Sequence, residues 1–208
     1  MNILRLLRSE KGAATVELVI LIPFLVAAMA IFISLWDAFR TASLSLYASY
    51  TVADHLSRKE TIIEDDDIDE LGDLFAFLAK STEDTAVRVT VLEMELDPVT
   101  DTPVLAWKYS RSTNTALVAE TTTVDDVRSH VPKLALGKRI YITEAYTDWT
   151  PFYGPGVMPA KRMYHVAATP PRFSAPLTRP EQDAVDAATA NPDVDPAEEG
   201  GTDMAAAE

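Results

Sequence analysis

The densest group of potential ligands in the sequence is a run of acids over residues 64–70, Glu-Asp-Asp-Asp-Ile-Asp-Glu. Carboxylates are the ligands that calcium prefers. An EF-hand loop that began at Asp65 would need glycine where Glu70 stands and glutamate where Ala76 stands, so this run lacks two defining residues of the loop. Acids also favour the first turn of a helix, where they offset its dipole. We therefore expect a solvated helix start, with weak cation binding as the alternative.

The other residue types that commonly carry chemistry are scattered. His55, His130 and His165 are far apart in the sequence, and none has a metal-binding spacing such as His-Glu-x-x-His. Gly154-Pro155-Gly156 does not fit a phosphate-binding loop, because no Lys-Ser/Thr pair follows and proline lacks an amide donor. The sequence contains no cysteine and no Gly-x-Ser-x-Gly motif. We expect no enzymatic activity, no metal and no cofactor.

The charge of the chain is strongly acidic outside a short basic leader. The formal net charge is −14, and the first 12 residues carry Arg5, Arg8 and Lys11 against Glu10 alone. The remainder therefore has three fewer of the 18 basic residues and one fewer of the 32 acids, a net charge of −16. Such a chain repels phosphates, so nucleic acid is not an expected partner.

An apolar segment follows the leader. Leu18–Trp36 contains no ionisable side chain over 19 residues. At about 1.5 Å per residue, a helix of this length spans roughly 28 Å, close to the hydrocarbon thickness of a bilayer. Positive charge beside the first apolar segment keeps that end in the cytoplasm. We expect a single-pass membrane helix with the C-terminal part exported.

The helix is expected to continue beyond the membrane, from about Ala13 to Arg58. Pro23 predicts a kink in its first third. Beyond Trp36, apolar residues at three- and four-residue steps predict a stripe that needs a folded domain to lie on. The stripe consists of Phe39, Ala42, Leu46, Tyr50, Ala53 and Leu56.

The rest of the chain predicts a small α+β domain with an antiparallel sheet. A second helix begins at the acids and places Ile68, Leu71, Leu74, Phe75 and Leu78 on one face. Apolar residues change face within 86–96, which indicates a bulge or a strand covered on both sides. The other expected elements are a hairpin partner over 104–110, a short helix within 123–134, and strands over 138–149 and 161–168.

The last segment differs in composition from the domain. Residues 174–208 carry nine acids against Arg179, several prolines and almost no large apolar residues. Such a segment cannot bury enough surface to offset the entropy of ordering, so we expect a disordered tail.

Aromatic residues gather before that tail, at Tyr146, Trp149, Phe152, Tyr153 and Tyr164. Aromatic side chains pack well in sheets and also form binding patches on surfaces. We expect them to serve packing in the sheet, with a partner-binding patch as the alternative.

The start of the chain resembles a known family. A basic leader that ends in Gly12, small residues, Glu17 at the fifth position after that glycine and then a long apolar helix look like a type IV prepilin. The short Ala-Thr-Val-Glu-Leu segment and the early Pro23 resemble the TadE/TadF-like pseudopilins (minor pilins) of Tad, or Flp, type IVb pilus systems. The strong match covers roughly residues 9–40. Leu18 follows the glutamate where the major Flp pilin often has tyrosine, which fits a minor pilin better.

The resemblance implies a domain map and a set of partners. It implies a cytoplasmic leader over 1–12, a transmembrane helix over 13–36, an exported pilin-like domain over 37–173 and the tail over 174–208. A prepilin peptidase would cut between Gly12 and Ala13, and Glu17 would serve assembly. The implied partners are other pilins or pseudopilins and the Tad platform of the bacterial inner membrane, with the domain in the periplasm.

Two simpler interpretations of the N-terminus remain open. The first is an ordinary signal anchor for a periplasmic adaptor or binding module with no filament role. The second is a cleaved secretory signal with Ala28-Met29-Ala30 as its cleavage site, although the chain stays apolar from Ile31 to Trp36, beyond that site.

Overall fold

The computed structural model describes residues 10–119, 122–154, 156, 158–173, 178–181 and 183, with the backbone alone for residues 10–15. The fold is mixed α+β, as predicted. Its elements are α2 (Glu10–Ser57), α3 (Asp65–Ala79), β1 (Thr85–Leu96), β2 (Pro103–Ser112), α4 (Val124–Val127), the 3₁₀ helix η1 (Arg128–His130), β3 (Arg139–Trp149) and β4 (Lys161–Thr169).

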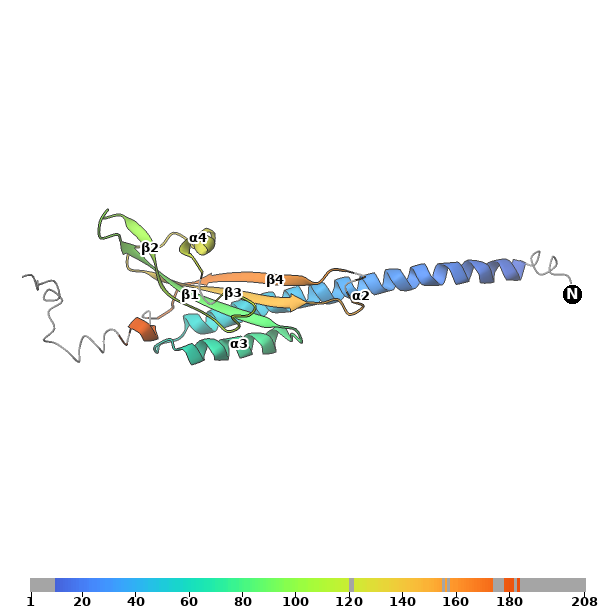
Figure 1. The fold of residues 1–208 in the computed structure, drawn as a ribbon, viewed down its shortest axis with the longest axis horizontal. Coiled ribbons are helices and arrows are strands. Elements are labelled where there is room, and N and C mark those ends of the chain that lie inside the picture. The colour runs from blue at the N-terminus through green and yellow to red at the C-terminus, as the bar shows by residue number, and fades with distance from the viewer. Residues whose placement is uncertain are drawn as a thin grey trace, which may run out of the picture.

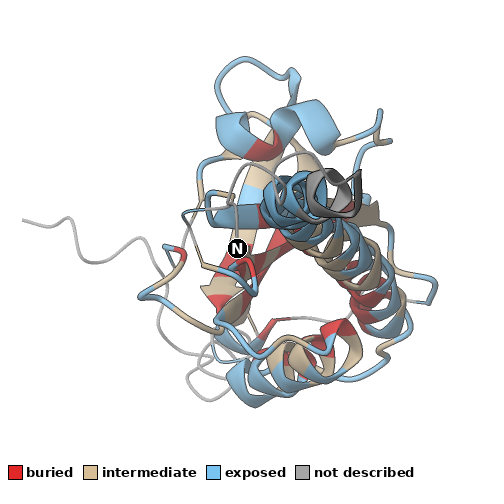
Figure 2. Cartoon of the chain, turned by 90° about the vertical axis from the view of Figure 1, so that its right-hand side faces the viewer, coloured by how far each residue is buried: buried red, intermediate tan, exposed pale blue. Residues whose placement is uncertain are grey.

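The four strands form one antiparallel sheet in the order β2-β1-β3-β4. Helices α2 and α3 cover one face of this sheet, and α4 lies on the other side (Figures 1 and 2). The strands lie alongside α2, whose N-terminal half projects beyond the sheet as a single rod (Figure 1). The helix continues through Pro23 without interruption.

The core between the helices and the sheet uses small residues on α2. Ala48, Val52, Ala53 and Leu56 are buried there, together with Ser45, Ser49 and Ser57. The other elements contribute larger side chains, namely Ile68 and Phe75 from α3, Val87 and Val89 from β1, and Tyr141 from β3.

The predicted stripe on α2 is therefore wrong in part. Ala53 and Leu56 are buried, but Phe39, Leu46 and Tyr50 are exposed, with Phe39 as much as 75% exposed. Small side chains let the helix axis approach the strands closely, and aromatic side chains at the same positions would hold the sheet away. The helix consequently turns its smallest residues inward and its aromatic residues outward.

The change of face within β1 has the predicted cause. The register between β1 and β2 shifts between Val91 and Leu92, which marks a β-bulge. Val89 and Val91 belong to the core against the helices, whereas Leu92 joins Ile140, Ile142 and Val127 in a second cluster on the opposite face. Residues 86–92 are buried throughout, so this part of β1 is also covered on both sides.

Residues 178–181, which lie within the tail expected to begin at residue 174, contact the domain. Thr178 is fully buried and pairs with Ile63 in an isolated parallel bridge. Glu181 accepts hydrogen bonds from Arg139 at 2.9 and 3.2 Å. Arg139, the first residue of β3, is thereby paired with two carboxylates, those of Glu93 and Glu181. The remainder of the expected tail lies outside the described residues.

Candidate functional site

The residues singled out by the sequence lie in the first turns of α2. Gly12 and Ala13 have helical backbone, and Glu17 follows about one turn later with its side chain exposed. Glu17 is the one ionisable residue between Gly12 and Asp37. The structure thus places the predicted processing and assembly residues together at the free end of the helix, while residues 1–9 of the leader lie outside the described residues.

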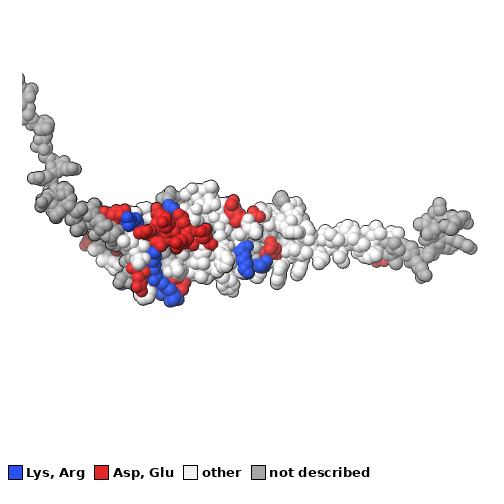
Figure 3. All heavy atoms as spheres, turned by 90° about the horizontal axis from the view of Figure 1, so that it is seen from below, with Lys and Arg blue, Asp and Glu red and all other residues white. Residues whose placement is uncertain are grey.

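The next turns of α2 form a column of exposed apolar side chains. Every large apolar residue from Val16 to Phe32 is exposed, Phe24 and Leu25 among the most exposed of them. In Figure 3 this half of the helix is a narrow, almost uncharged rod beside the charged domain. It is the one helix within the described residues that is long and apolar enough to cross a membrane, and 6% of its most apolar window is buried. A surface of this kind suits a membrane anchor.

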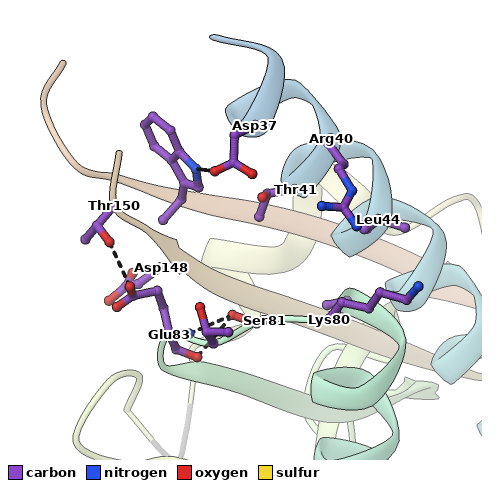
Figure 4. Close-up of a pocket in the computed structure, with 12 residues that line it drawn as sticks. Asp37, Arg40, Thr41, Leu44, Lys80, Ser81, Glu83, Asp148 and Thr150 are labelled. Atoms are coloured by element: carbon purple, nitrogen blue, oxygen red, sulfur yellow. Dashed lines mark hydrogen bonds between the residues drawn. The ribbon is translucent and has the colours of Figure 1, made fainter. Parts of the chain in front are cut away.

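The exposed column ends where the domain meets the helix. The indole Nε1 of Trp149, the last residue of β3, donates a hydrogen bond of 2.9 Å to Asp37. Beside this contact lies a cleft of about 210 Å³ between α2, the α3–β1 turn and the end of β3 (Figure 4). Thr150 Oγ1 donates to Glu83 across the cleft at 2.7 Å. Arg40 lines the α2 side of this cleft.

The acidic side chains that line this cleft bind other parts of the protein. Asp148 accepts two hydrogen bonds from Arg162, at 2.7 and 3.0 Å, and Asp37 and Glu83 each accept one from a neighbouring side chain. The Arg162 guanidinium holds the pKa of Asp148 below its usual range, so that carboxylate stays ionised. These three acids all accept hydrogen bonds from protein side chains. The bond between Trp149 and Asp37 holds the end of β3 against α2.

A buried polar network lies on the opposite face of the sheet. Arg88 on β1 and Glu144 on β3 are direct cross-strand partners, with Arg88 Nε 2.7 Å and Nη2 2.9 Å from the two carboxylate oxygens. Tyr146 and Tyr164 donate to Glu144 Oε1 at 3.1 and 2.8 Å. Burial, and next the nearby Glu144 carboxylate, raise the pKa of Tyr146 to about 12. Arg88 also donates to the Ala119 carbonyl at 3.2 Å.

This network holds the strands and the segment before α4 together. Glu144 is nearly inaccessible, and its carboxylate is occupied by three neighbouring side chains. A buried ion pair needs such extra hydrogen bonds to offset the loss of hydration. The pair was not predicted from the sequence, because its members lie 56 residues apart. Only the β1–β3 register brings them together, and no local motif signals that register.

The acidic run forms a helix start, as predicted, and it also makes ion pairs. Asp67 closes a capping box with the backbone of Glu64 and accepts from Lys59 Nζ at 2.6 Å. The Tyr109 hydroxyl donates a hydrogen bond of 2.6 Å to Asp65, and burial, followed by this hydrogen bond, raises the pKa of that hydroxyl. The cluster forms the large acidic patch on α3 in Figure 3.

The histidines are not brought together. His165 on β4 lies 2.8 Å from Ser45 Oγ on α2, and burial lowers the pKa of its imidazole. His130 contacts its neighbour Ser129, and His55 lies in the last turn of α2. Among the described residues, no group of three His, Asp or Glu side chains is arranged to hold a metal ion.

The geometry therefore centres on α2, whose first half is a bare apolar rod with Glu17 near its start and whose second half carries the sheet. Comparison of the chain with family models, with curated proteins and with solved structures gave no match.

Proposed function

We propose that this chain is a minor pilin, or pseudopilin, of the TadE/TadF-like kind that takes part in assembling a Flp-type pilus. It is inserted in the bacterial inner membrane by α2, with a cytoplasmic leader and a periplasmic domain. Its partners are other pilins and the membrane platform of the same system.

The observation that carries the proposal is the continuity of α2. One helix of 48 residues includes the Gly12–Glu17 segment, the exposed apolar column and the face that packs on the sheet. A flexible linker between anchor and domain would suit an ordinary signal-anchored adaptor equally well. A continuous helix holds the domain at a fixed position relative to the membrane, which is what stacking of many subunits by their helices needs.

Cleavage between Gly12 and Ala13 is the first test. We expect co-expression with a prepilin peptidase to yield protein whose N-terminal residue is Ala13, as read by intact-mass spectrometry. Gly12→Val should block cleavage, because a branched side chain shields the neighbouring carbonyl, whereas Val16→Ala should be cut normally. An intact leader in both the unchanged protein and Val16→Ala would favour the signal anchor. A new N-terminus near Ile31 would favour a secretory signal.

The role of Glu17 is the second test. After cleavage, the new amine of Ala13 lies within five residues of the Glu17 carboxylate at the apolar boundary. In an assembly, the amine of one subunit pairs with the carboxylate of another, and an unpaired charge there is costly. Glu17→Gln should leave the protein cleaved and in the membrane but reduce cross-linking to other pilins. Glu60→Gln, at an exposed position beyond the end of α2, is the matched control. Wild-type cross-linking by Glu17→Gln would contradict the proposed role.

A further inference from the structure

The connection between β3 and β4 carries two exposed aromatic residues. Phe152 is 79% exposed and Tyr153 about half exposed, and their rings stack edge to face with centroids 5.1 Å apart. Trp149 and Pro151, just before them, are buried. The chain therefore anchors the base of this connection in the domain and presents Phe152 and Tyr153 outward.

The position of the connection along α2 is fixed by contacts. Trp149 bonds to Asp37, one residue after the apolar run ends at Trp36. Below Asp37, Ser34 is fully buried and Ala30 is half-buried, so the domain covers α2 for a further seven residues, or about 10 Å. The β3–β4 connection is the part of the domain nearest the bare half of α2 (Figure 1).

These covered turns belong to the apolar run itself. If Leu18–Trp36 just spans the hydrocarbon, whatever lies beside Ala30–Trp36 stands between the outer edge of the hydrocarbon and a depth of about 10 Å. Aromatic side chains prefer that depth, because their rings are apolar and, in tyrosine, the hydroxyl reaches water. Trp36 and Phe39 are also exposed at this level of α2.

We infer that Phe152 and Tyr153 insert into the outer interface of the same bilayer that α2 crosses, so that the domain contacts lipid at a second point. The occupant of this aromatic surface is the lipid interface, chosen because the connection is the part of the domain nearest the apolar column of α2 (Figure 1). Charge at this end is mixed, with Arg40 and Lys80 beside Glu83 and Asp84, so the aromatic rings provide the contact. The inference rests on α2 spanning the membrane, which the proposed function also requires.

The absence of cysteine allows a direct measurement of depth. Single-cysteine variants Phe152→Cys and Phe173→Cys are labelled with a nitroxide and reconstituted in vesicles of phosphatidylethanolamine and phosphatidylglycerol. Phe173, which is 54% exposed, is the matched control. It lies beyond the other end of β4, beside the last residue of α2, because the neighbouring Arg172 N–H donates a hydrogen bond of 2.8 Å to the Ser57 carbonyl. Collision of each label with oxygen, which concentrates in lipid, is compared with collision with a water-soluble nickel chelate.

We expect the ratio of oxygen to nickel collisions to be several-fold higher at residue 152 than at residue 173. Equal ratios would overturn the inference. A label at 152 shielded from both reagents would also overturn it, because that result means a protein contact, such as a second copy, covers the loop.

A third label, Phe24→Cys, separates this inference from the proposed function. Phe24 lies in the exposed apolar column, so its label should report lipid. A lipid-buried label at 24 with a water-exposed label at 152 overturns the loop contact alone. A water-exposed label at 24 overturns the spanning helix, and with it both proposals.

Discussion

The two halves of α2 share one backbone and differ in what surrounds them. From Val16 to Ile33 the helix buries no side chain, whereas from Ser34 to Ser57 one face lies against the sheet. In both halves aromatic side chains are exposed, Phe24 in the first and Phe39 and Tyr47 in the second. The face of α2 that meets the sheet carries serine, alanine, valine and leucine, and the aromatic side chains lie outside it.

Hydroxyl groups on the packed face illustrate the same point. Ser45, Ser49 and Ser57 are buried, and each donates to a carbonyl three residues earlier in α2, at 3.2, 2.7 and 2.8 Å. Because the Ser49 and Ser57 hydroxyls are satisfied within the helix, they need no partner on the sheet, whereas Ser45 Oγ also lies 2.8 Å from His165 Nε2 on β4. The packed face of α2 thus includes buried serines whose hydroxyl groups donate hydrogen bonds within the helix itself.

Truncation of a leucine should change the free energy of unfolding very differently in the two halves of α2, and this is the largest effect that we expect. Leu56 is 1% exposed at the centre of the core, so Leu56→Ala should lower the free energy of unfolding of the domain by about 2–5 kcal/mol. Leu21→Ala, the same change in the exposed half, should leave it unchanged. Urea unfolding in detergent, followed by tryptophan fluorescence, measures both. Equal effects would mean that the two halves are not packed differently.

An added charge should have the larger effect in the exposed half of α2, the reverse of the leucine truncations. Val26→Lys places an ammonium near the middle of the apolar run, at a cost of about 2.5–3.5 kcal/mol on insertion scales. Tyr47→Lys adds the same charge to the outward face of the packed half, where the side chain already meets solvent. We expect Val26→Lys to deplete the protein from alkali-washed membranes and Tyr47→Lys to have little effect. Retention of Val26→Lys would contradict a spanning helix.

A smaller effect is expected at the boundary between the halves. Trp149→Phe removes the hydrogen bond to Asp37 but keeps an aromatic ring, and bonds to charged groups contribute about 1.5–3 kcal/mol. Trp107→Phe is the control, because Trp107 is partly exposed on an edge strand. Thermal unfolding followed by near-ultraviolet circular dichroism compares them. A larger loss in the control would show that Trp149 does not fasten the domain to the helix.

The smallest effect depends on pH. Burial lowers the pKa of His165 below its ordinary value of 6.5, so the unfolded chain binds this proton more readily than the folded one. Stability is therefore unaffected above about pH 7 and falls as the pH drops below about 6.5. His165→Gln should flatten part of the change in melting temperature between about pH 7.5 and about pH 5. An unchanged profile would mean that other groups cause the acid sensitivity.

Sequence patterns within single segments predicted most of the fold. The long helix, the helix that starts at Asp65, the hairpin and the later strands all appear within a few residues of their expected bounds. The bulge in β1 was predicted from apolar residues that change face, because alternation has a period of two and any shift shows directly. Periodicity is encoded within a segment and needs no knowledge of its neighbours.

Features that depend on pairing between segments were not predictable. Arg88 and Glu144 meet only through the β1–β3 register, and Thr178 is buried where it pairs with Ile63, 115 residues earlier in the chain. The predicted face of α2 was also wrong in part: Ala53 and Leu56 are buried as expected, but Phe39 and Tyr50, expected to be buried because they are apolar, are exposed. Gly12, Ala13 and Glu17 lie together at the start of the helix, but their roles rest on the resemblance and await the experiments above.

The contacts between α2 and the sheet also have a mechanical consequence. Asp37, Ser45 and Asp54 are bonded to Trp149, His165 and Arg172, which places three ties over about 26 Å of helix. The strands lie alongside the helix axis, so a pull along that axis shears all three ties at once (Figure 1). Bonds that share a force fail together at a high load, whereas bonds peeled in sequence fail one by one. Tension on the N-terminal end of α2 should therefore move the whole domain as a unit before it separates the sheet from the helix.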